Sequence, residues 1–212
     1  MGESVGVHLL LASGSTYRRD VLVDAGVQVT QVAPEIDERV LDDWLVTHGA
    51  EALAAELAVR KLDAVLPTLT AAERALPVVA ADQVGVLDTA TGPVLLTKCA
   101  TADSATAQLR RLSGTTHRLV NGVIVAMGER RAAGIDVQEV TFRHLSAEEI
   151  ERYVAWAKPF DTSGSYRIED DGTAGAEPFV VRVAGEDRTG VTGMPLPLLW
   201  RLLAQLGVGP PG

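Results

Sequence analysis

The sequence contains a single cysteine, Cys99, among its 212 residues. One thiol excludes an intramolecular disulfide framework and is typical of a reducing compartment such as the cytosol. No apolar run is long enough to cross a bilayer, and the first residues contain neither a basic segment nor a cleavage site, so we expect no membrane span and no signal peptide. These absences predict a cytoplasmic protein with no membrane partner.

Basic residues are in the minority, because 19 lysines and arginines stand against 28 aspartates and glutamates and give a formal net charge of −9. No basic stripe offsets this charge, so binding to a nucleic-acid polymer is not expected. The chain also lacks the phosphate-binding pattern G-x-x-x-x-G-K-[ST]. A small anion held by a few local cations remains possible, and a protein this acidic is expected to need a divalent metal to accept a triphosphate.

The stretch from Leu11 to Leu22 contains the first indication of such a site. An apolar run ends at Ala12, the small polar residues 13–16 follow, and Arg18 and Arg19 come next at the start of a helical pattern. This order predicts a strand, a tight loop and a helix, whose unpaired backbone N–H groups and dipole suit a phosphate. Two arginines oppose that dipole unless an anion lies nearby, although a solvated arginine pair explains them equally well.

The remaining elements are predicted from periodicity and turn residues. Helices are expected over 51–65, 101–112, 147–157 and 195–206, and strands over 27–33, 78–87, 117–127, 135–144 and 179–183. Ser146 and Glu149 form a capping box before the third of these helices. Strands and helices alternate early and an antiparallel pair follows, so the predicted class is α/β with a mixed sheet.

Several carboxylates are candidates for chemistry. Asp82 comes where the apolar part of a strand runs out, a usual place for ligands in an open α/β sheet, although an acid that only ends strand pairing is commoner. Glu35, Asp37 and Glu38 form an acidic cluster, which is either a solvated turn or, close to Asp82, an oxygen-rich metal site. The four histidines show no metal-binding spacing.

Taken in order, these motifs resemble the Maf family of nucleoside triphosphate pyrophosphatases. The resemblance rests on LASGSTYRRDVL, PEIDE, LAVRK, AADQVGVLD, the lysine at 98, LSGTTHRLVNGV, FRHLSAEEIERYV, DTSGSYRIE and TGMPLPLLWRLLAQLG, and it extends from Leu9 to Gly207. It implies a mixed twisted sheet flanked by helices, in two lobes around a central cleft, as in inosine triphosphate pyrophosphatases. We therefore expect residues 1–212 to form a single Maf-like domain with a disordered tail at 208–212.

The resemblance also implies an activity and a set of site residues. Family members are metal-dependent and commonly homodimeric, and they cleave a nucleoside triphosphate to the monophosphate and pyrophosphate. Asp82 would be the general base, Ser13, Arg18, Arg19, Lys61 and Lys98 would bind the triphosphate, and Glu35, Asp37 and Glu38 with Asp82 would hold magnesium, manganese or cobalt. Attack of water on the α-phosphorus requires the leaving pyrophosphate to be neutralised by these cations. Departures from the family's usual residues, such as Asn121 in place of threonine, concern loop shape more than charge.

Three residues resemble the subfamily that prefers 7-methyl-GTP. Tyr17 could stack on a cationic methylated purine, Glu169 could accept hydrogen bonds from the guanine N1–H and amino group, and Gln83 offers a donor and an acceptor. One alternative is a dTTP/UTP pyrophosphatase of the same family. Another is a non-catalytic nucleotide-binding regulator of cell division.

Overall fold

The computed structural model describes residues 6–37, 44–170 and 177–211, which form two compact units. The first unit lies within residues 1–83, 120–136 and 186–212, and the second within 84–119 and 137–185. The chain thus passes between the units four times, and the prediction of a single domain around a central cleft stays a prediction.

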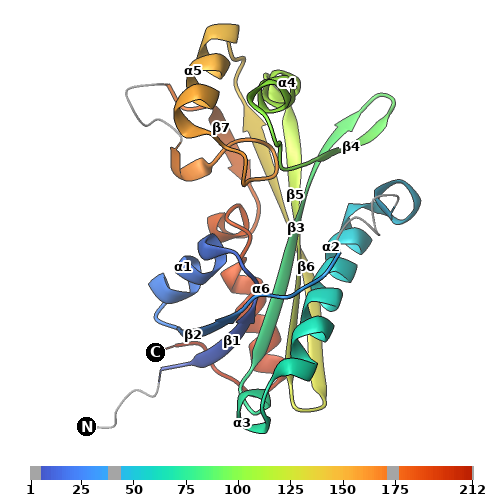
Figure 1. The fold of residues 1–212 in the computed structure, drawn as a ribbon, viewed down its shortest axis with the longest axis vertical. Helices are drawn as coiled ribbons and strands as arrows, with labels where there is room; N and C mark the ends of the chain where they lie inside the picture. Colours follow the sequence, from blue (N-terminus) through green and yellow to red (C-terminus); the bar gives the residue numbers. More distant parts are fainter. Residues whose placement is uncertain (1–5, 38–43, 171–176, 212) are drawn as a thin grey trace. The chain divides into compact units, whose positions relative to one another are not determined.

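The helices and strands alternate along the first part of the chain, as expected. They are β1 (His8–Ala12), α1 (Thr16–Asp24), β2 (Gln28–Val32), α2 (Trp44–Val65), α3 (Ala71–Arg74), β3 (Val78–Thr89), β4 (Gly92–Leu96), α4 (Ala102–Leu112), β5 (Thr116–Met127), β6 (Arg130–Phe142), α5 (Ala147–Ala157), β7 (Val180–Ala184) and α6 (Leu196–Gln205), with short 3₁₀ turns at η2 (Leu66–Thr68), η3 (Ile168–Asp170) and η5 (Arg188–Gly190) (Figure 1). Ser146 and Glu149 form the predicted capping box of α5.

The strands form one hydrogen-bonded sheet in the order β2-β1-β3-β5-β6-β7, and β4 pairs with β3. β1 runs parallel to both β2 and β3, whereas the β3–β4 and β6–β7 pairs are antiparallel. The predicted α/β class with a mixed sheet is therefore confirmed.

In the first unit both faces of the sheet are buried. Alternate residues of β1 belong to different clusters: Leu9 and Leu11 pack with α1 and α6, whereas Leu10 and Ala12 pack with α2. The same alternation continues in β3, where odd-numbered residues face α6 and even-numbered residues face α2. Burial on both faces explains why these strands are almost continuously apolar.

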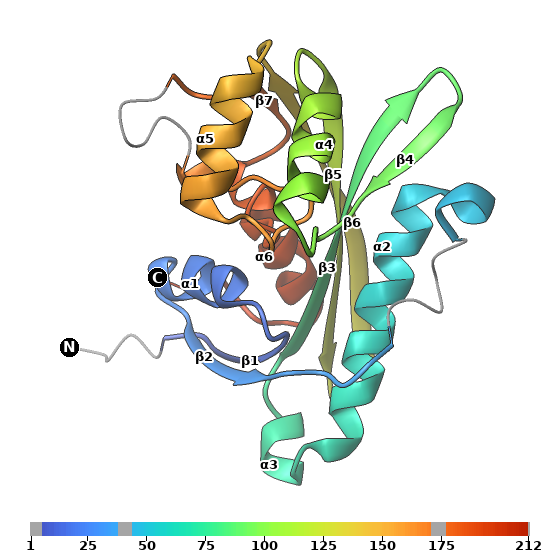
Figure 2. The same ribbon diagram turned by 45° about the horizontal axis from the view of Figure 1, so that its top comes forward.

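The second unit has an aromatic core. His117, Phe142 and Tyr166 contact one another edge to face, with ring centroids 4.9–5.4 Å apart. Phe142 also contacts Phe179 just before β7. Helices α4 and α5 lie side by side in both ribbon views (Figure 2). Few aromatic residues occur in the chain, and several of them are gathered here.

Two element boundaries differ from the sequence prediction. β6 begins at Arg130 and not at Ile135, so the connecting turn is much shorter than the expected 128–134. The polar segment 128–134 suggested a turn, but Ala132 is buried and a Cβ at Gly134 would lie 2.7 Å from Leu198 of α6. Small residues here serve close packing between strand and helix, which tertiary structure alone reveals.

Helix α2 begins at Trp44, seven residues earlier than predicted, with a kink at Gly49 (φ 86°). At the other end of the chain, Val208 of the expected tail packs against the core and donates its N–H to the Leu203 carbonyl at 3.0 Å. In the described part of the chain, no helix combines the length and the apolar character that a bilayer span requires.

The close approach of α2 to β5 generates a stability prediction. A Cβ at Gly122 would lie 2.2 Å from the Ala54 carbonyl oxygen, so Gly122→Ala forces helix and strand apart. We expect a loss of about 3 kcal/mol in the free energy of unfolding, at the upper end for overpacked cores, measured by urea denaturation. Gly209→Ala is the control, because its Cβ would contact nothing within 4 Å. Equal stability of the two variants would contradict this packing.

Candidate functional site

The loop between β1 and α1 has the predicted strand–loop–helix form. Ser15 caps α1 and accepts a hydrogen bond from the Arg18 N–H at 3.4 Å. The buried Ser13 hydroxyl accepts from the Ser15 N–H and from Arg18 Nη1, both at 3.2 Å. Ser13 and Arg18, two of the predicted phosphate ligands, are therefore brought into contact.

Gln31 of β2 orients the backbone of this loop. Its amide nitrogen donates to the carbonyls of Ser13 at 2.7 Å and Ser15 at 3.1 Å. Because the C=O and N–H of a trans peptide point in opposite directions, the N–H groups of Gly14 and Thr16 are directed away from Gln31. Together with the positive end of α1, they form the kind of surface that attracts an anion.

The two arginines of α1 have different surroundings. Arg18 Nε donates to the Gly193 carbonyl at 2.9 Å, which holds the guanidinium between Ser13 and the loop before α6. Arg19 forms an ion pair with the adjacent Asp20 at 2.7 Å, and 44% of its side chain is exposed. The structure thus builds Arg18 into the loop, whereas phosphate binding by Arg19 stays a prediction.

Asp82 and Lys61 form a buried ion pair. The Lys61 ammonium of α2 donates to the Asp82 carboxylate, and about a tenth of each side chain is exposed. The sequence suggested that Asp82 lies where the apolar part of a strand ends. In the structure β3 continues to Thr89, so Asp82 lies within the strand. It is β1 that ends, at Ala12, so Asp82 lies beyond the end of its neighbouring strand.

Gln83 points to the opposite face of β3 from Asp82. Its amide nitrogen donates to Asn121 Oδ1 at 3.1 Å and to the carbonyls of Gly190 and Val191, each at 3.0 Å. The prediction that Gln83 offers both a donor and an acceptor to a ligand is therefore too broad. Its donor hydrogens are already used within the protein.

Gly193 lies close to both Arg18 and Gln83. Gly193 has φ +89°, and a Cβ there would lie 3.3 Å from Arg18 Nε and 3.6 Å from Gln83 Nε2. Because 3.3 and 3.6 Å add to 6.9 Å, the two side-chain nitrogens are no more than 6.9 Å apart. The arginine-bearing loop and the middle of β3 thus meet at one place in the first unit.

Those predicted metal ligands that the structure describes do not form a protein cage. Glu35 and Asp37 are exposed after β2, and Glu38 lies outside the described residues. The described residues contain no cluster of three or more histidine, cysteine, aspartate or glutamate side chains suited to a metal. Magnesium often binds through one or two carboxylates, water and substrate phosphates, and Asp82 fits that arrangement.

The second unit contains the remaining predicted residues. Lys98 is exposed and forms an isolated backbone bridge with Ser163. The loop that follows Ser163 is held by two hydrogen bonds. Gln108 donates to the Ser165 hydroxyl at 2.9 Å, and the Tyr166 hydroxyl lies 2.9 Å from His117 Nε2. Glu169 lies in η3, and its side chain is outside the description. A role for Lys98 or Glu169 beside Asp82 stays a prediction.

His117 is a buried structural histidine. Burial lowers its pKa from 6.5 to about 4, so it is neutral at pH 7. Its Nδ1 finds no hydrogen-bond partner among the described residues, and a charge at this position would be poorly solvated.

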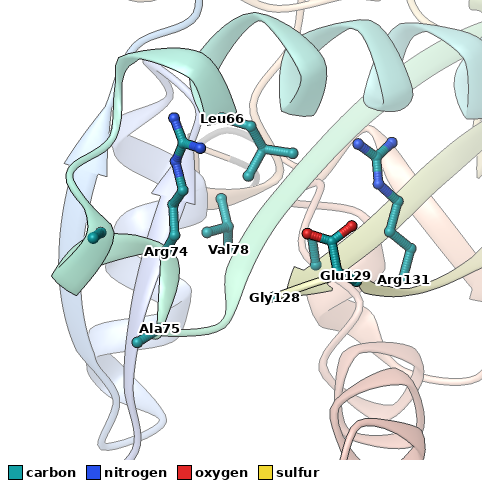
Figure 3. A pocket seen from close by; sticks show the side chains of 9 residues that line it. Leu66, Arg74, Ala75, Val78, Gly128, Glu129 and Arg131 are labelled. Atoms are coloured by element: carbon teal, nitrogen blue, oxygen red, sulfur yellow. The ribbon is translucent and has the colours of Figure 1, made fainter.

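A separate hollow of about 500 Å³ lies near the start of β3 (Figure 3). Arg74 and Arg131 line it, together with Glu129 and apolar residues such as Val78. Arg74 donates to the carbonyls of Leu69 and Pro67, and Arg131 pairs with Asp63. The predicted site residues that the structure describes do not line this hollow. Val78 precedes Asp82 by ~13 Å of strand.

Sequence reasoning missed the residues that support the site. Gln31, Asp136 and Gly193 were not proposed, and Asn121 was noticed only as a departure from a family pattern. Gln31 and Asp136 are ordinary polar residues within strands, so no local signal distinguishes them. Gly193 lies within the segment TGMPL, where a glycine before a proline indicates a turn but not its contacts.

Comparisons with known proteins agree on one family. A family profile described as Maf-like protein matches residues 8–206. A dTTP/UTP pyrophosphatase of Alkalilimnicola ehrlichii is 36% identical over 191 residues, which cover 89% of this chain and 88% of that protein. The dTTP/UTP pyrophosphatase of Salmonella typhimurium is 36% identical over 92% and 91% of the two chains. A 7-methyl-GTP pyrophosphatase of Xanthomonas axonopodis pv. citri is 34% identical over 94% and 96%.

The buried ion pair predicts a specific pattern of stabilities. Lys61→Met leaves the Asp82 carboxylate buried without its cation, which costs about 3–5 kcal/mol of unfolding free energy. Lys61→Met combined with Asp82→Asn should be more stable than Lys61→Met alone, because no isolated charge remains. The control is Arg131→Met, which breaks a half-exposed pair with Asp63 and should cost less than about 1 kcal/mol. A double variant less stable than the single one, in urea unfolding, would contradict this account.

The buried His117 predicts a pH dependence of stability. Its pKa is depressed in the folded protein, so between pH 6.5 and 4 the unfolded chain binds a proton that the folded protein does not. Stability therefore falls as pH decreases, and His117 should account for a loss of about 2 kcal/mol between pH 7 and 5. In His117→Leu that part of the loss should disappear, whereas His144→Leu, at an exposed position, should retain it. Urea unfolding at the two pH values is the measurement.

Proposed function

Because this chain belongs to the Maf family, we propose that it is a nucleoside triphosphate pyrophosphatase, which hydrolyses its substrate to a nucleoside monophosphate and pyrophosphate. The observation that carries this proposal is the buried Asp82–Lys61 pair beyond the end of β1, next to the anion-attracting start of α1. Hydrolysis of a phosphoanhydride needs a base for water and cations for the leaving group, and these residues supply both. The relatives named as pyrophosphatases support the same reaction.

The roles follow from the contacts of each side chain. The Ser13–Thr16 loop and Arg18 bind the phosphates, because their donors surround one end of α1. Asp82 orients the attacking water and takes its proton, while Lys61 holds the carboxylate in place and adds positive charge beside the phosphates. Arg19 binds the outer phosphates in this proposal.

A divalent cation fits this site as a partner of the substrate. Asp82 would hold it, with Glu35 or Asp37 as a second carboxylate and the phosphates as the remaining ligands. Bound there, the metal would supply positive charge to the phosphate oxygens. The chain's own residues still position the phosphates and the water.

We propose 7-methyl-GTP as the preferred substrate, with dTTP or UTP as the alternative. Tyr17, at the start of α1 and half-buried, would stack on a cationic base, and Gln83 would accept a hydrogen bond from a base N–H. The alternative is favoured by the relatives at 36% identity, which are named dTTP/UTP pyrophosphatases, against 34% for one named 7-methyl-GTP pyrophosphatase. A difference of two percentage points does not decide between them, so kinetics must.

The central experiment measures pyrophosphate release. Wild-type protein is assayed with 7-methyl-GTP, GTP, dTTP and UTP in the presence of magnesium, manganese or cobalt, and kcat/KM is compared. Asp82→Asn should lower kcat by at least ~100-fold, the usual contribution of a general base, while nucleotide binding is retained. The matched control is Asp88→Asn, which removes an exposed carboxylate from the same strand and should leave kcat unchanged.

Two outcomes would contradict the proposal. A wild-type protein that binds these nucleotides but releases no pyrophosphate would favour the non-catalytic regulator. Full activity in Asp82→Asn would remove Asp82 from the mechanism. A higher kcat/KM for dTTP or UTP than for 7-methyl-GTP would retain the reaction and reverse the substrate preference.

A further inference from the structure

A network of hydrogen bonds between two side-chain amides and one carboxylate connects β3, β5 and β6 in the first unit. Asp136 of β6 accepts a hydrogen bond from Asn121 Nδ2 at 2.9 Å, and the same nitrogen donates to the Gly190 carbonyl at 2.8 Å. Asn121 Oδ1 in turn accepts from Gln83 Nε2. Asn121 is completely buried and Asp136 is 7% exposed, so these hydrogen bonds are shielded from water.

The orientation of both amides follows from their partners. Gln83 contacts two backbone carbonyls, which can only accept hydrogen bonds, so its nitrogen and not its oxygen must face them. Asn121 faces a carboxylate and a carbonyl, so its nitrogen must point toward Asp136 and its oxygen toward Gln83. Each amide therefore has one possible orientation. Asp136 and the Gly190 carbonyl orient Asn121. Asn121 Oδ1 and two backbone carbonyls together orient Gln83.

The consequence concerns what Gln83 can offer to a ligand. Its two amide hydrogens are shared among three protein oxygens. Oε1 lies on the other side of the amide, and no described residue donates to it. Gln83 is half-buried, and its nitrogen lies within 6.9 Å of Arg18 Nε at the start of α1.

We propose that Asn121 and Asp136 are positioning residues that make Gln83 an acceptor only, so that the site selects a nucleotide presenting a hydrogen-bond donor to it. The inference rests on the proposed function and specifies how the same site recognises its substrate. The donor is a base N–H, such as N1–H of guanine or N3–H of uracil, or a sugar hydroxyl. The two sources share one chemistry and are separated by the analogues in the test.

The activity test uses matched nucleotide pairs. The pairs are 7-methyl-GTP with 1,7-dimethyl-GTP, UTP with 3-methyl-UTP, and each parent with its 3′-deoxy form. Blocking the nucleotide group that donates a hydrogen bond to Gln83 should lower kcat/KM of the wild type by about tenfold. The pair that shows this loss identifies whether the donor belongs to the base or to the sugar. This loss of kcat/KM should disappear in Gln83→Met, which keeps the side-chain length but has no amide. If the loss came instead from a steric clash of the added methyl group, it would persist in Gln83→Met.

Asn121→Ala tests the positioning role. Gln83 is retained in this variant but no longer contacts Asn121 Oδ1. Blocking the nucleotide's donor should therefore lower kcat/KM less than threefold, and the parent nucleotide should also react more slowly. Glu139→Gln, an exposed change on the same strand as Asp136, should keep the wild-type loss of kcat/KM. A wild-type loss below twofold for every pair, or an undiminished loss in both Gln83→Met and Asn121→Ala, would overturn the proposal.

A second measurement does not depend on catalysis. In protein labelled with ¹⁵N-glutamine, the side-chain N–H groups of Gln83 should exchange with solvent at least tenfold more slowly than those of an exposed glutamine such as Gln28. Asp136→Asn leaves no buried charge and should still accelerate this exchange, because a neutral oxygen holds Asn121 less strongly. Fast exchange in the wild type would overturn the inference. Slow exchange in a protein that hydrolyses no nucleotide would refute the proposed function but leave the orientation of Gln83 established.

Discussion

The alternation of side chains along β3 is the constraint on which the proposed site depends. Neighbouring residues of a strand point to opposite faces, so Asp82 reaches α2 and Lys61 while Gln83 reaches the loop before α6. Both faces are covered in the first unit, and two adjacent residues therefore serve different purposes at one position of the sheet. β1 ends at Ala12, so Asp82 and Gln83 both lie beyond the end of the neighbouring strand.

The loop before α6 has a larger part in this arrangement than its length suggests. Its carbonyls at Gly190 and Val191 accept from Gln83, and its carbonyl at Gly193 accepts from Arg18. A residue proposed to bind phosphates and a residue proposed to read the base thus share one backbone segment. A shift of this segment would move both, which links phosphate binding to base recognition in a way that neither motif indicates alone.

Charge in the first unit follows two patterns. Exposed pairs such as Arg19–Asp20 and Arg131–Asp63 are solvated and contribute little to stability. The Lys61–Asp82 pair is buried, and replacing a buried pair by apolar groups is often neutral or stabilising. The retention of two charges at a cost in desolvation is a reason to assign them a chemical role. The two arginines of the 500 Å³ hollow, in contrast, are already engaged by backbone carbonyls and by Asp63.

Much of the fold could be predicted from the chain alone, because the signals are local. The stretch from Leu11 to Leu22 indicated a strand, a loop and a helix, and Ser146 with Glu149 indicated the start of α5. Predictions failed where a local pattern has two explanations. The polar segment 128–134 resembles a turn, yet residues 130–134 belong to β6, and α6 packs closely on Gly134.

The sequence by itself determined the family, the α/β class and the residue types that a phosphate site requires, since motif order and periodicity are properties of the chain. Only the tertiary structure decided which of those residues act together. The pairing of Lys61 with Asp82 and the orientation of Gln83 by Asn121 and Asp136 join residues separated by 15 to 38 positions. Hydrogen-bond direction depends on which partners burial brings together, and no local pattern contains that information.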